Sequence, residues 1–230
     1  MNDSGRGSLV AWSLRQGLQA ARKNRVPALL LQAIALSIVL VYYIHEPSRP
    51  VFDAIAALKL RYGYLFSLVS TALFGALIPL IILRAQPATR QSNPWRYLPF
   101  LLLFWAEKGV EVDALYRVQA FFFGADLTLS TVLPKVFVDQ FVYMPLINLP
   151  PLILLYLWRD CGYSVSRTRA ALGPRWYRNR VVPVMISNWG VWIPAVTLIY
   201  CLPVPLQLPV ENLILCLWVL LLSVLTNKES

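Results

Sequence analysis

Three long stretches without a charged residue constrain the fold more than any other feature of this sequence. Residues 26–44, 62–83 and 181–210 contain no Asp, Glu, Lys or Arg. Each is as long as a membrane-crossing helix, which needs roughly 20 apolar residues. Inside a bilayer no water satisfies the backbone amides and carbonyls, so uncharged segments of this length form helices. We therefore predict an all-α, multi-pass transmembrane helical bundle that forms a single integral membrane domain over residues 1–230.

The composition agrees with a membrane protein. Of the 230 residues, 58% are hydrophobic and 14% are charged, whereas a soluble domain has about 25% charged residues. The net charge of +10 does not indicate nucleic-acid binding, because the arginines lie between apolar stretches and form no basic face with interleaved aromatic residues. Cytoplasmic loops of membrane proteins collect Lys and Arg. We expect membrane lipids as partners and no nucleic acid.

Prolines divide the last apolar region into two helices. Residues 202–209 contain three prolines, which an α-helix rarely accommodates. We therefore expect a turn there, between helices over about 183–202 and about 210–226. Glu211 would then begin the last helix, where the helix dipole favours a negative charge.

The number of crossings depends on the middle of the chain. Residues 97–124 form a weakly hydrophobic span, and a stronger one covers about 132–158, so we expect five or six membrane helices. Six crossings place the basic residues of 1–25, of the loop after the second span and of 159–180 on one side. Basic loops stay on the cytoplasmic or matrix side, and this places both termini there. For residues 1–25, an interfacial helix is favoured over a mitochondrial targeting segment.

Two helices contain residues that favour close packing. Small or helix-breaking residues recur at every fourth position from residue 63 to residue 79, and they form one ridge of a helix, along which another helix approaches closely. A narrow polar path along this ridge is the alternative. A similar face recurs in the last helix, and the prolines near residue 145 bend another. The predicted packing positions are Gly63, Ser67, Thr71, Gly75, Pro145, Trp218 and Ser223.

Charged residues open the span at 132–158. Lys135 and Asp139 are four residues apart and share a helix face, and Gln140 follows directly. An isolated charge near the bilayer centre costs about 2.5–3.5 kcal/mol, so these side chains should face the interior of the bundle. They form either a structural ion pair, with Asp113 or Arg117 as partners on another helix, or the lining of a solute path.

Further polar positions extend this cluster. Asn148 lies on the same helix, and Asn188 and Trp192 lie one turn apart on the next one. In a solute path, Asn188 and Trp192 would form a facing wall. Small solutes are then expected partners, and a homo-oligomer remains open.

The chain has no pattern that indicates catalysis or metal binding. Its three cysteines, Cys161, Cys201 and Cys216, are widely spaced, and His45 is its one histidine. Structural zinc sites use closely spaced Cys and His ligands. We find no nucleophile–base pair and no glycine-rich phosphate loop. We therefore expect no metal, no cofactor and no enzymatic activity.

Several segments resemble the Mpv-seventeen family, which includes the twenty-two-kilodalton peroxisomal membrane protein. KVFVDQFVYMP (135–145) resembles its K-xxx-DQ-xxxx-P signature, and NWGVW (188–192) with Pro194 is similar to its Asn-Trp…Trp-Pro segment. ENLILCLWVLLLS (211–223) reproduces its Asn, Trp and Leu-Ser spacing. The resemblance covers residues 105–226. The residue that usually follows the family's Val-Pro is arginine, and Pro209 stands there in this chain.

This resemblance implies a small multi-pass protein of a peroxisomal, mitochondrial inner or related membrane, or of the plasma membrane in a bacterium. Family members are regarded as channels for small solutes. Sequence and resemblance together predict a pore or low-selectivity channel for small hydrophilic solutes or ions. A non-transporting protein with a structural, lipid-organising or assembly role is the alternative.

Overall fold

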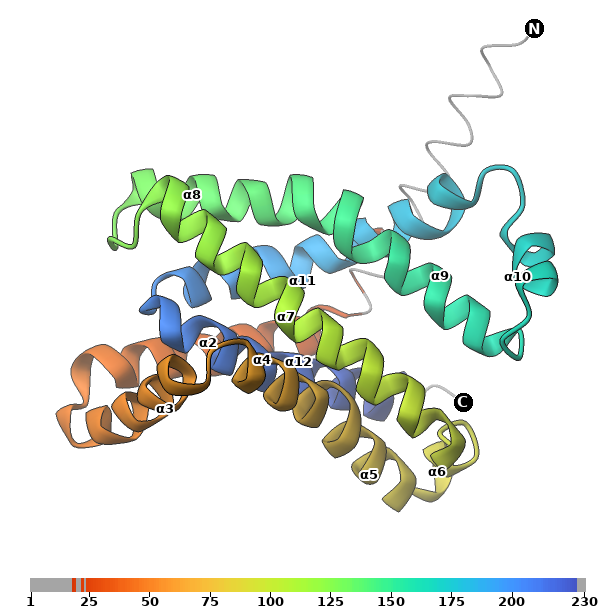
Figure 1. Ribbon diagram of the computed structural model, residues 1–230, viewed down its shortest axis with the longest axis horizontal. Helices are drawn as coiled ribbons and strands as arrows, with labels where there is room; N and C mark the ends of the chain where they lie inside the picture. Colours follow the sequence, from red (N-terminus) through yellow and green to blue (C-terminus); the bar gives the residue numbers. More distant parts are fainter. Residues whose placement is uncertain (1–17, 20–21, 23, 227–230) are drawn as a thin grey trace, which may run out of the picture. The chain divides into compact units, whose positions relative to one another are not determined.

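The computed structural model describes residues 18–19, 22 and 24–226, with side chains up to residue 221, and this part of the chain consists of helices joined by short turns (Figure 1). Most of residues 1–25, where we expected an interfacial helix, lies outside the described residues. The α-helices are α2 (Arg25–Ile44), α3 (Arg49–Tyr62), α4 (Tyr64–Ala72), α5 (Ile78–Ala85), α6 (Pro87–Arg90), α7 (Leu98–Phe123), α8 (Leu129–Phe137), α9 (Leu149–Asp160), α10 (Val165–Leu172), α11 (Val182–Tyr200) and α12 (Val204–Thr226).

Other helical turns join or interrupt these elements. The π-helical segments are η2 (Leu73–Leu77), η4 (Val138–Asn148) and η5 (Tyr177–Val181), and the 3₁₀ turns are η1 (Glu46–Ser48) and η3 (Trp95–Tyr97). The chain forms two compact units. Unit 1 comprises residues 1–26 and 136–194, and unit 2 comprises residues 27–135 and 195–230.

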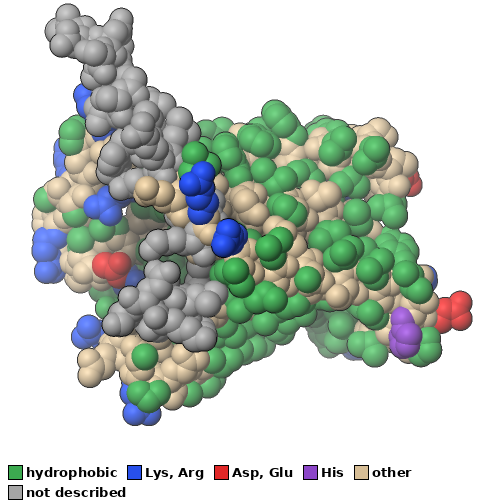
Figure 2. Space-filling view, turned by 180° about the vertical axis from the view of Figure 1, so that it is seen from behind, with side chains coloured by type: hydrophobic (Ala, Val, Ile, Leu, Met, Phe, Trp, Pro, Cys, Tyr) green, Lys and Arg blue, Asp and Glu red, His purple; other side chains and the backbone are tan. Residues whose placement is uncertain are grey.

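Five helices in the described part of the chain are long and apolar enough to cross a membrane. They cover Arg25–Ile44, Tyr64–Ala85, Leu129–Asp160, Tyr177–Tyr200 and Val204–Leu221. Large hydrophobic side chains on these helices remain exposed, and hydrophobic residues cover most of the face drawn in Figure 2. A bilayer would remove this apolar surface from water. The prediction of an all-α, multi-pass membrane protein is therefore confirmed.

Helix α7 lies alongside α4 in unit 2 and has the reverse of a soluble helix pattern (Figure 1). Its buried residues include Lys108, Asp113 and Gln119, whereas Leu103 and Phe121 are among its most exposed side chains. At 1.5 Å per residue, its 26 residues extend about 39 Å, which exceeds the hydrocarbon thickness of a bilayer. Polar residues inside and apolar residues outside are the arrangement expected of a helix in lipid.

Helices α4 and α7 pack closely along part of the predicted ridge. Ser67 and Thr71 are buried on α4. A Cβ atom on Gly75 would lie 2.6 Å from the Trp105 ring of α7, and one on Gly109 of α7 would lie 2.5 Å from the Thr71 hydroxyl. Two glycines, one from each side, therefore let the helices approach.

Gly63 has a different role from the one we predicted. It separates α3 from α4 with φ 52°, and a Cβ atom there would meet nothing within 4 Å. Only glycine adopts this backbone conformation without strain. Gly63 therefore permits the turn between two helices and provides no close approach.

Two other expectations needed correction. Residues 49–62 connect the first two predicted spans and were therefore expected to form a loop, but they form helix α3. This helix has Pro50 in its first turn, where the missing amide costs nothing. The turn near residue 202 is confirmed, but α12 begins at Val204, because a proline in the first turn of a helix loses no hydrogen bond. Glu211 therefore lies about two turns inside α12 and does not begin it.

Candidate functional site

A charged cluster joins three helices of unit 2. Lys59 of α3 and Asp113 of α7 form an ion pair at 2.5 Å, with side chains only 3% and 4% exposed. The Ser67 hydroxyl of α4 donates to the same Asp113 oxygen at 2.8 Å, and the Lys59 ammonium lies 2.8 Å from that hydroxyl. Ionised partners make these bonds stronger than those between neutral groups.

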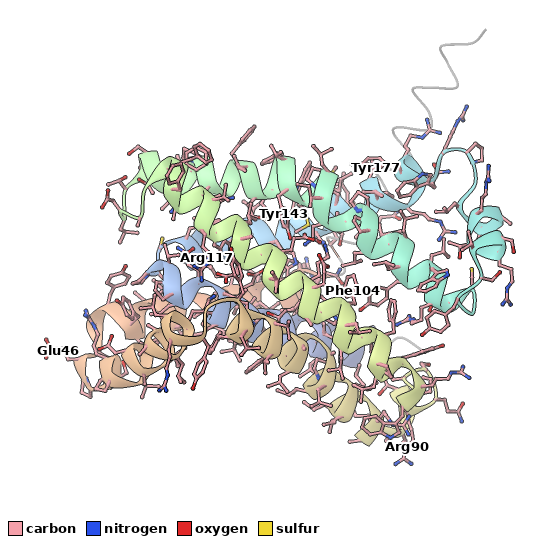
Figure 3. All side chains as sticks on the ribbon, viewed as in Figure 1. Glu46, Arg90, Phe104, Arg117, Tyr143 and Tyr177 are labelled. Carbon is pink, nitrogen blue, oxygen red and sulfur yellow. The ribbon has the colours of Figure 1, made fainter. Side chains whose placement is uncertain are left out.

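Arg117 completes the cluster toward its outer side. Its guanidinium donates to the second oxygen of Asp113 at 3.2 Å and lies 4.7 Å from the centre of the Tyr64 ring. The side chain is 46% exposed, so it is more solvated than Lys59. Figure 3 shows Arg117 on α7, beside α4. Asp113 therefore joins one buried and one exposed cation.

Burial and the ion pair act on Lys59 in opposite directions. Burial lowers the pKa of the Lys59 ammonium, and the hydrogen bond that the ammonium donates to Asp113 opposes this change without cancelling it. Helix α3 is not one of the five candidate spans. The neutral form of this lysine is therefore easier to reach than that of a lysine in water.

A neutral polar contact follows between α4 and α12. The Thr71 hydroxyl donates to the Asn212 side-chain oxygen at 2.9 Å, and the Asn212 amide donates to the Ser70 hydroxyl at 3.0 Å. Thr71 and Asn212 are both buried. Side-chain hydrogen bonds of this kind hold helices together where the hydrophobic effect contributes little.

A third set of polar side chains lies around the C-terminal half of α7. The Tyr116 hydroxyl donates to the Glu211 carboxylate of α12 at 2.7 Å, and the Tyr116 ring makes an edge contact with Tyr200 at 5.3 Å. The Lys135 ammonium lies 5.9 Å from the centre of the Tyr200 ring. The Gln119 amide donates to the Lys135 carbonyl at 3.4 Å. The buried polar residues of α7 from Lys108 to Gln119 thus extend over about 16 Å.

The residues that we expected to form one cluster are divided between the two compact units. Lys135 belongs to unit 2, whereas Asp139 and Gln140 belong to unit 1. All three side chains are buried, as predicted. The Gln140 amide donates to Asp139 at 2.9 Å. Asp113, proposed as a partner for this group, pairs with Lys59.

The prolines of η4 explain two contacts in unit 1. In a π-helix each carbonyl accepts from the amide five residues later, and Leu149 does donate to Met144 in this way. The amides five residues after Gln140 and Pro145 belong to prolines, which have no N–H. The Trp189 indole donates to the Gln140 carbonyl at 3.0 Å, and the Tyr177 hydroxyl donates to the Pro145 carbonyl at 2.8 Å.

Pro145 is buried, and its carbonyl accepts a hydrogen bond from the Tyr177 hydroxyl. The sequence prediction did not identify Trp189 or Tyr177 as donors. Figure 3 labels Tyr177, which begins η5, and Tyr143 of η4. The sequence does indicate that donors are needed here, because prolines at 145 and 150 remove two amides, five residues apart, from one helix.

The remaining predicted residues have mixed surroundings. Asn148 is half-buried and donates to the Tyr143 hydroxyl at 3.1 Å. Asn188 is half-buried, while Trp192 and Trp218 are buried. The Ser223 side chain lies outside the described part of the chain. Asn188 and Trp192 both belong to unit 1, as do Asp139 and Gln140.

Sequence reasoning missed Lys59 as a site residue. It lies in a segment with four charges over 14 residues, RPVFDAIAALKLRY, and that density indicated a loop. The sequence does hold a signal for this role, since Lys59 lies four residues before Gly63. A lysine near the end of a short amphipathic helix lies close to the start of the helix that follows the turn.

The five apolar helices and their buried polar contacts define a multi-pass integral membrane protein. Comparisons with known protein families, with curated proteins and with solved structures found no match.

Proposed function

We propose that unit 2 forms a passive path for small hydrophilic solutes or ions, with the Lys59–Asp113–Ser67 cluster as its closed gate. The observation that supports this is a series of buried and half-buried polar contacts on and beside α7. Lys59 with Asp113, Thr71 with Asn212 and Tyr116 with Glu211 lie in this series. Residues of four different helices contribute to it.

The energetics favour an inward polar face with a function. A charge at the centre of a membrane costs several kcal/mol, and intramembrane ionisable residues usually mark ion or solute pathways. Unit 2 buries Lys59, Lys108, Asp113 and Lys135. A purely structural helix would reach the same packing with apolar residues at lower cost.

Contact distances make the cluster a closed gate. The 2.5–2.8 Å separations between Lys59, Ser67 and Asp113 leave no room for a solute. Conduction therefore requires α3 to move relative to α4 and α7. Gly63, which joins α3 to α4 with an open surrounding, is the position at which such a hinge would act.

The same contacts favour one second candidate, a non-transporting structural or assembly role. Both oxygens of Asp113 already accept hydrogen bonds from the protein. A fully satisfied buried network holds helices in one arrangement. In this role the three contacts fix α3, α4, α7 and α12 together and no solute passes.

The resemblance to the Mpv-seventeen family supports the transport proposal, because its members are regarded as solute channels. We extend the proposal to location: both termini on the cytoplasmic or matrix side of a bacterial plasma, mitochondrial inner or peroxisomal membrane. Lys59 of this cluster lies outside the region that carries the resemblance, whereas Asp113 lies within it.

Liposome reconstitution tests the proposed function. Pure protein should release trapped hydrophilic solutes below a size limit, and Asp113→Asn should change that flux while the protein remains folded. The control is Asp53→Asn on the exposed side of α3, which should leave flux unchanged. Absence of flux at every pH and voltage, together with unfolding of Asp113→Asn, would replace the transport proposal with the structural role.

A further inference from the structure

Lys135 is a buried cation that forms no ion pair within 4.0 Å in the described part of the chain, although the Asp126 carboxylate attracts it from a greater distance. Its side chain is among the largest fully buried ones, at 2% exposure. None of the ion pairs formed by described residues includes it. The contact of its ammonium is the Tyr200 ring, 5.9 Å away at the centre, which is near the limit of a cation–π interaction.

The other two buried lysines of unit 2 differ in this respect. Lys59 is paired with Asp113 at 2.5 Å, and Lys108 is paired with Glu111 at 2.6 Å. Buried charges in proteins are paired or bind a ligand, because an unpaired one costs several kcal/mol. Lys135 breaks this rule in a unit where the other two follow it.

A second buried group beside Lys135 also lacks a partner. Gln119 is 1% exposed, and its amide donates to the Lys135 carbonyl at 3.4 Å. Its side-chain oxygen has no hydrogen-bond partner. More than nine in ten buried polar groups in proteins are satisfied, so an orphaned oxygen needs an explanation. The ammonium offers hydrogen-bond donors, and the amide oxygen requires one.

We propose that Lys135 and Gln119 bind a small hydroxycarboxylate between α7, α8 and the end of α11. The ligand carboxylate would accept from the Lys135 ammonium, and the ligand hydroxyl would donate to the Gln119 oxygen. The Tyr116 and Tyr200 rings supply an apolar side for the short carbon chain. This assignment rests on the proposed function, since it names the solute class, but its test measures binding and not flux.

Glycolate and acetate are the probes, because they differ only in the hydroxyl. Full-length protein in detergent micelles is unfolded by heat at constant ionic strength, with each sodium salt replacing sodium chloride. A ligand that binds the folded state raises the midpoint with concentration. Glycolate should raise it more than acetate does, and the concentration dependence gives the Kd of each salt.

Variants assign the effect to the two side chains. Lys135→Met keeps the side-chain volume and should weaken glycolate binding at least about tenfold, as expected for a hydrogen bond to a charged group. Gln119→Leu should make glycolate and acetate equal. Lys108→Met removes the buried lysine that is already paired and should leave the glycolate Kd unchanged.

The unliganded variants give a readout independent of binding. Lys135→Met removes an unpaired buried charge and should be more stable than the native chain when no carboxylate is present. Saturating glycolate should narrow that difference. Equal midpoints for the native chain in glycolate and chloride, or equal glycolate affinity in the native chain and Lys135→Met, would overturn the assignment. These results can occur whether or not liposomes show solute flux, so binding and transport fail separately.

Discussion

The contribution of the Lys59–Asp113 pair to folding can be measured with a double-mutant cycle. Both side chains are nearly inaccessible, at 3% and 4% exposure, so solvent screening reduces their interaction little. Removing one partner of a buried ion pair leaves an uncompensated charge and costs about 3–5 kcal/mol. We expect Lys59→Met to lower the free energy of unfolding by about 3 kcal/mol, because Arg117 and Ser67 still contact Asp113.

The reverse change should cost more. Asp113→Leu leaves the Lys59 ammonium with only the Gly63 carbonyl and the Ser67 hydroxyl as acceptors, so we expect a loss of about 4 kcal/mol. The double variant buries two apolar side chains and should lose only about 1 kcal/mol, since apolar replacements of a buried pair are often neutral. The coupling free energy is then about 6 kcal/mol, far above that of distant sites.

Unfolding in mixed micelles with increasing sodium dodecyl sulfate provides the assay, with tryptophan fluorescence as the signal. The Arg159–Asp160 pair, whose Asp160 side chain is 55% exposed, serves as the control, and Asp160→Asn should change stability by less than about 1 kcal/mol. If the two single variants each cost under about 1 kcal/mol and their effects add, the ion pair is not buried as described and the reasoning fails.

Three further predictions follow from other contacts. Gly109→Ala should lower stability by about 2 kcal/mol. The loss should exceed that of Gly75→Ala, because a new methyl at 109 meets the Ser67 carbonyl of the backbone, whereas one at 75 meets the Trp105 ring. The opposite order in micelle unfolding would refute this packing. Trp189→Phe should lower stability by about 1–2 kcal/mol, because it leaves the Gln140 carbonyl unsatisfied. In a chain that also carries Pro145→Ala, which restores an amide, Trp189→Phe should cost nothing. Equal losses with and without Pro145→Ala would show that the proline does not leave the carbonyl without a donor. Burial holds the pKa of Lys59 in the folded state below its value of 10.5 in the unfolded chain. Between the folded and unfolded pKa, the folded state therefore binds fewer protons than the unfolded state. Stability should therefore rise with pH in that window, and Lys59→Met should lack this rise; identical pH profiles would contradict it.

The membrane helices could be predicted from the sequence because lipid leaves one solution for an uncharged stretch of 20 residues. Residues 26–44 match α2 within one residue, and residues 62–83 match the helix from Tyr64 to Ala85 closely. Positions inside these helices were also predictable where small residues alternate with larger ones. Ser67, Thr71 and Gly75 all face α7 or α12.

The partners of charged residues were not predictable, because they depend on which helices are adjacent. Lys135 and Asp139 are four residues apart, and the sequence offered Asp113 or Arg117 on another helix as their partners. Asp113 was recognised as a partner, but for the wrong lysine. The correct one, Lys59, is 54 residues away in the chain, and it lies in a segment whose charge density suggested a loop.

Proline effects were partly predictable in the same way. Prolines near residue 145 were expected to bend their helix, and Pro145 and Pro150 leave two carbonyls that side chains satisfy. The side chains that satisfy these carbonyls come from the region of residues 177–189, and only the packing of η4 against that region identifies them. Local rules predict the demand for a hydrogen bond, and tertiary structure supplies the donor.

The proposed path requires α7 to cross the membrane with its charged residues facing inward. Single cysteines at Gln91, before α7, and at Asp126, after it, in a chain whose native cysteines are replaced by serine or alanine, can be labelled with an impermeant maleimide in sealed vesicles. The account predicts that one position reacts only from outside and the other only after the vesicles are opened. If both positions react from the same side, α7 does not cross, and the buried polar series cannot connect the two faces of the membrane.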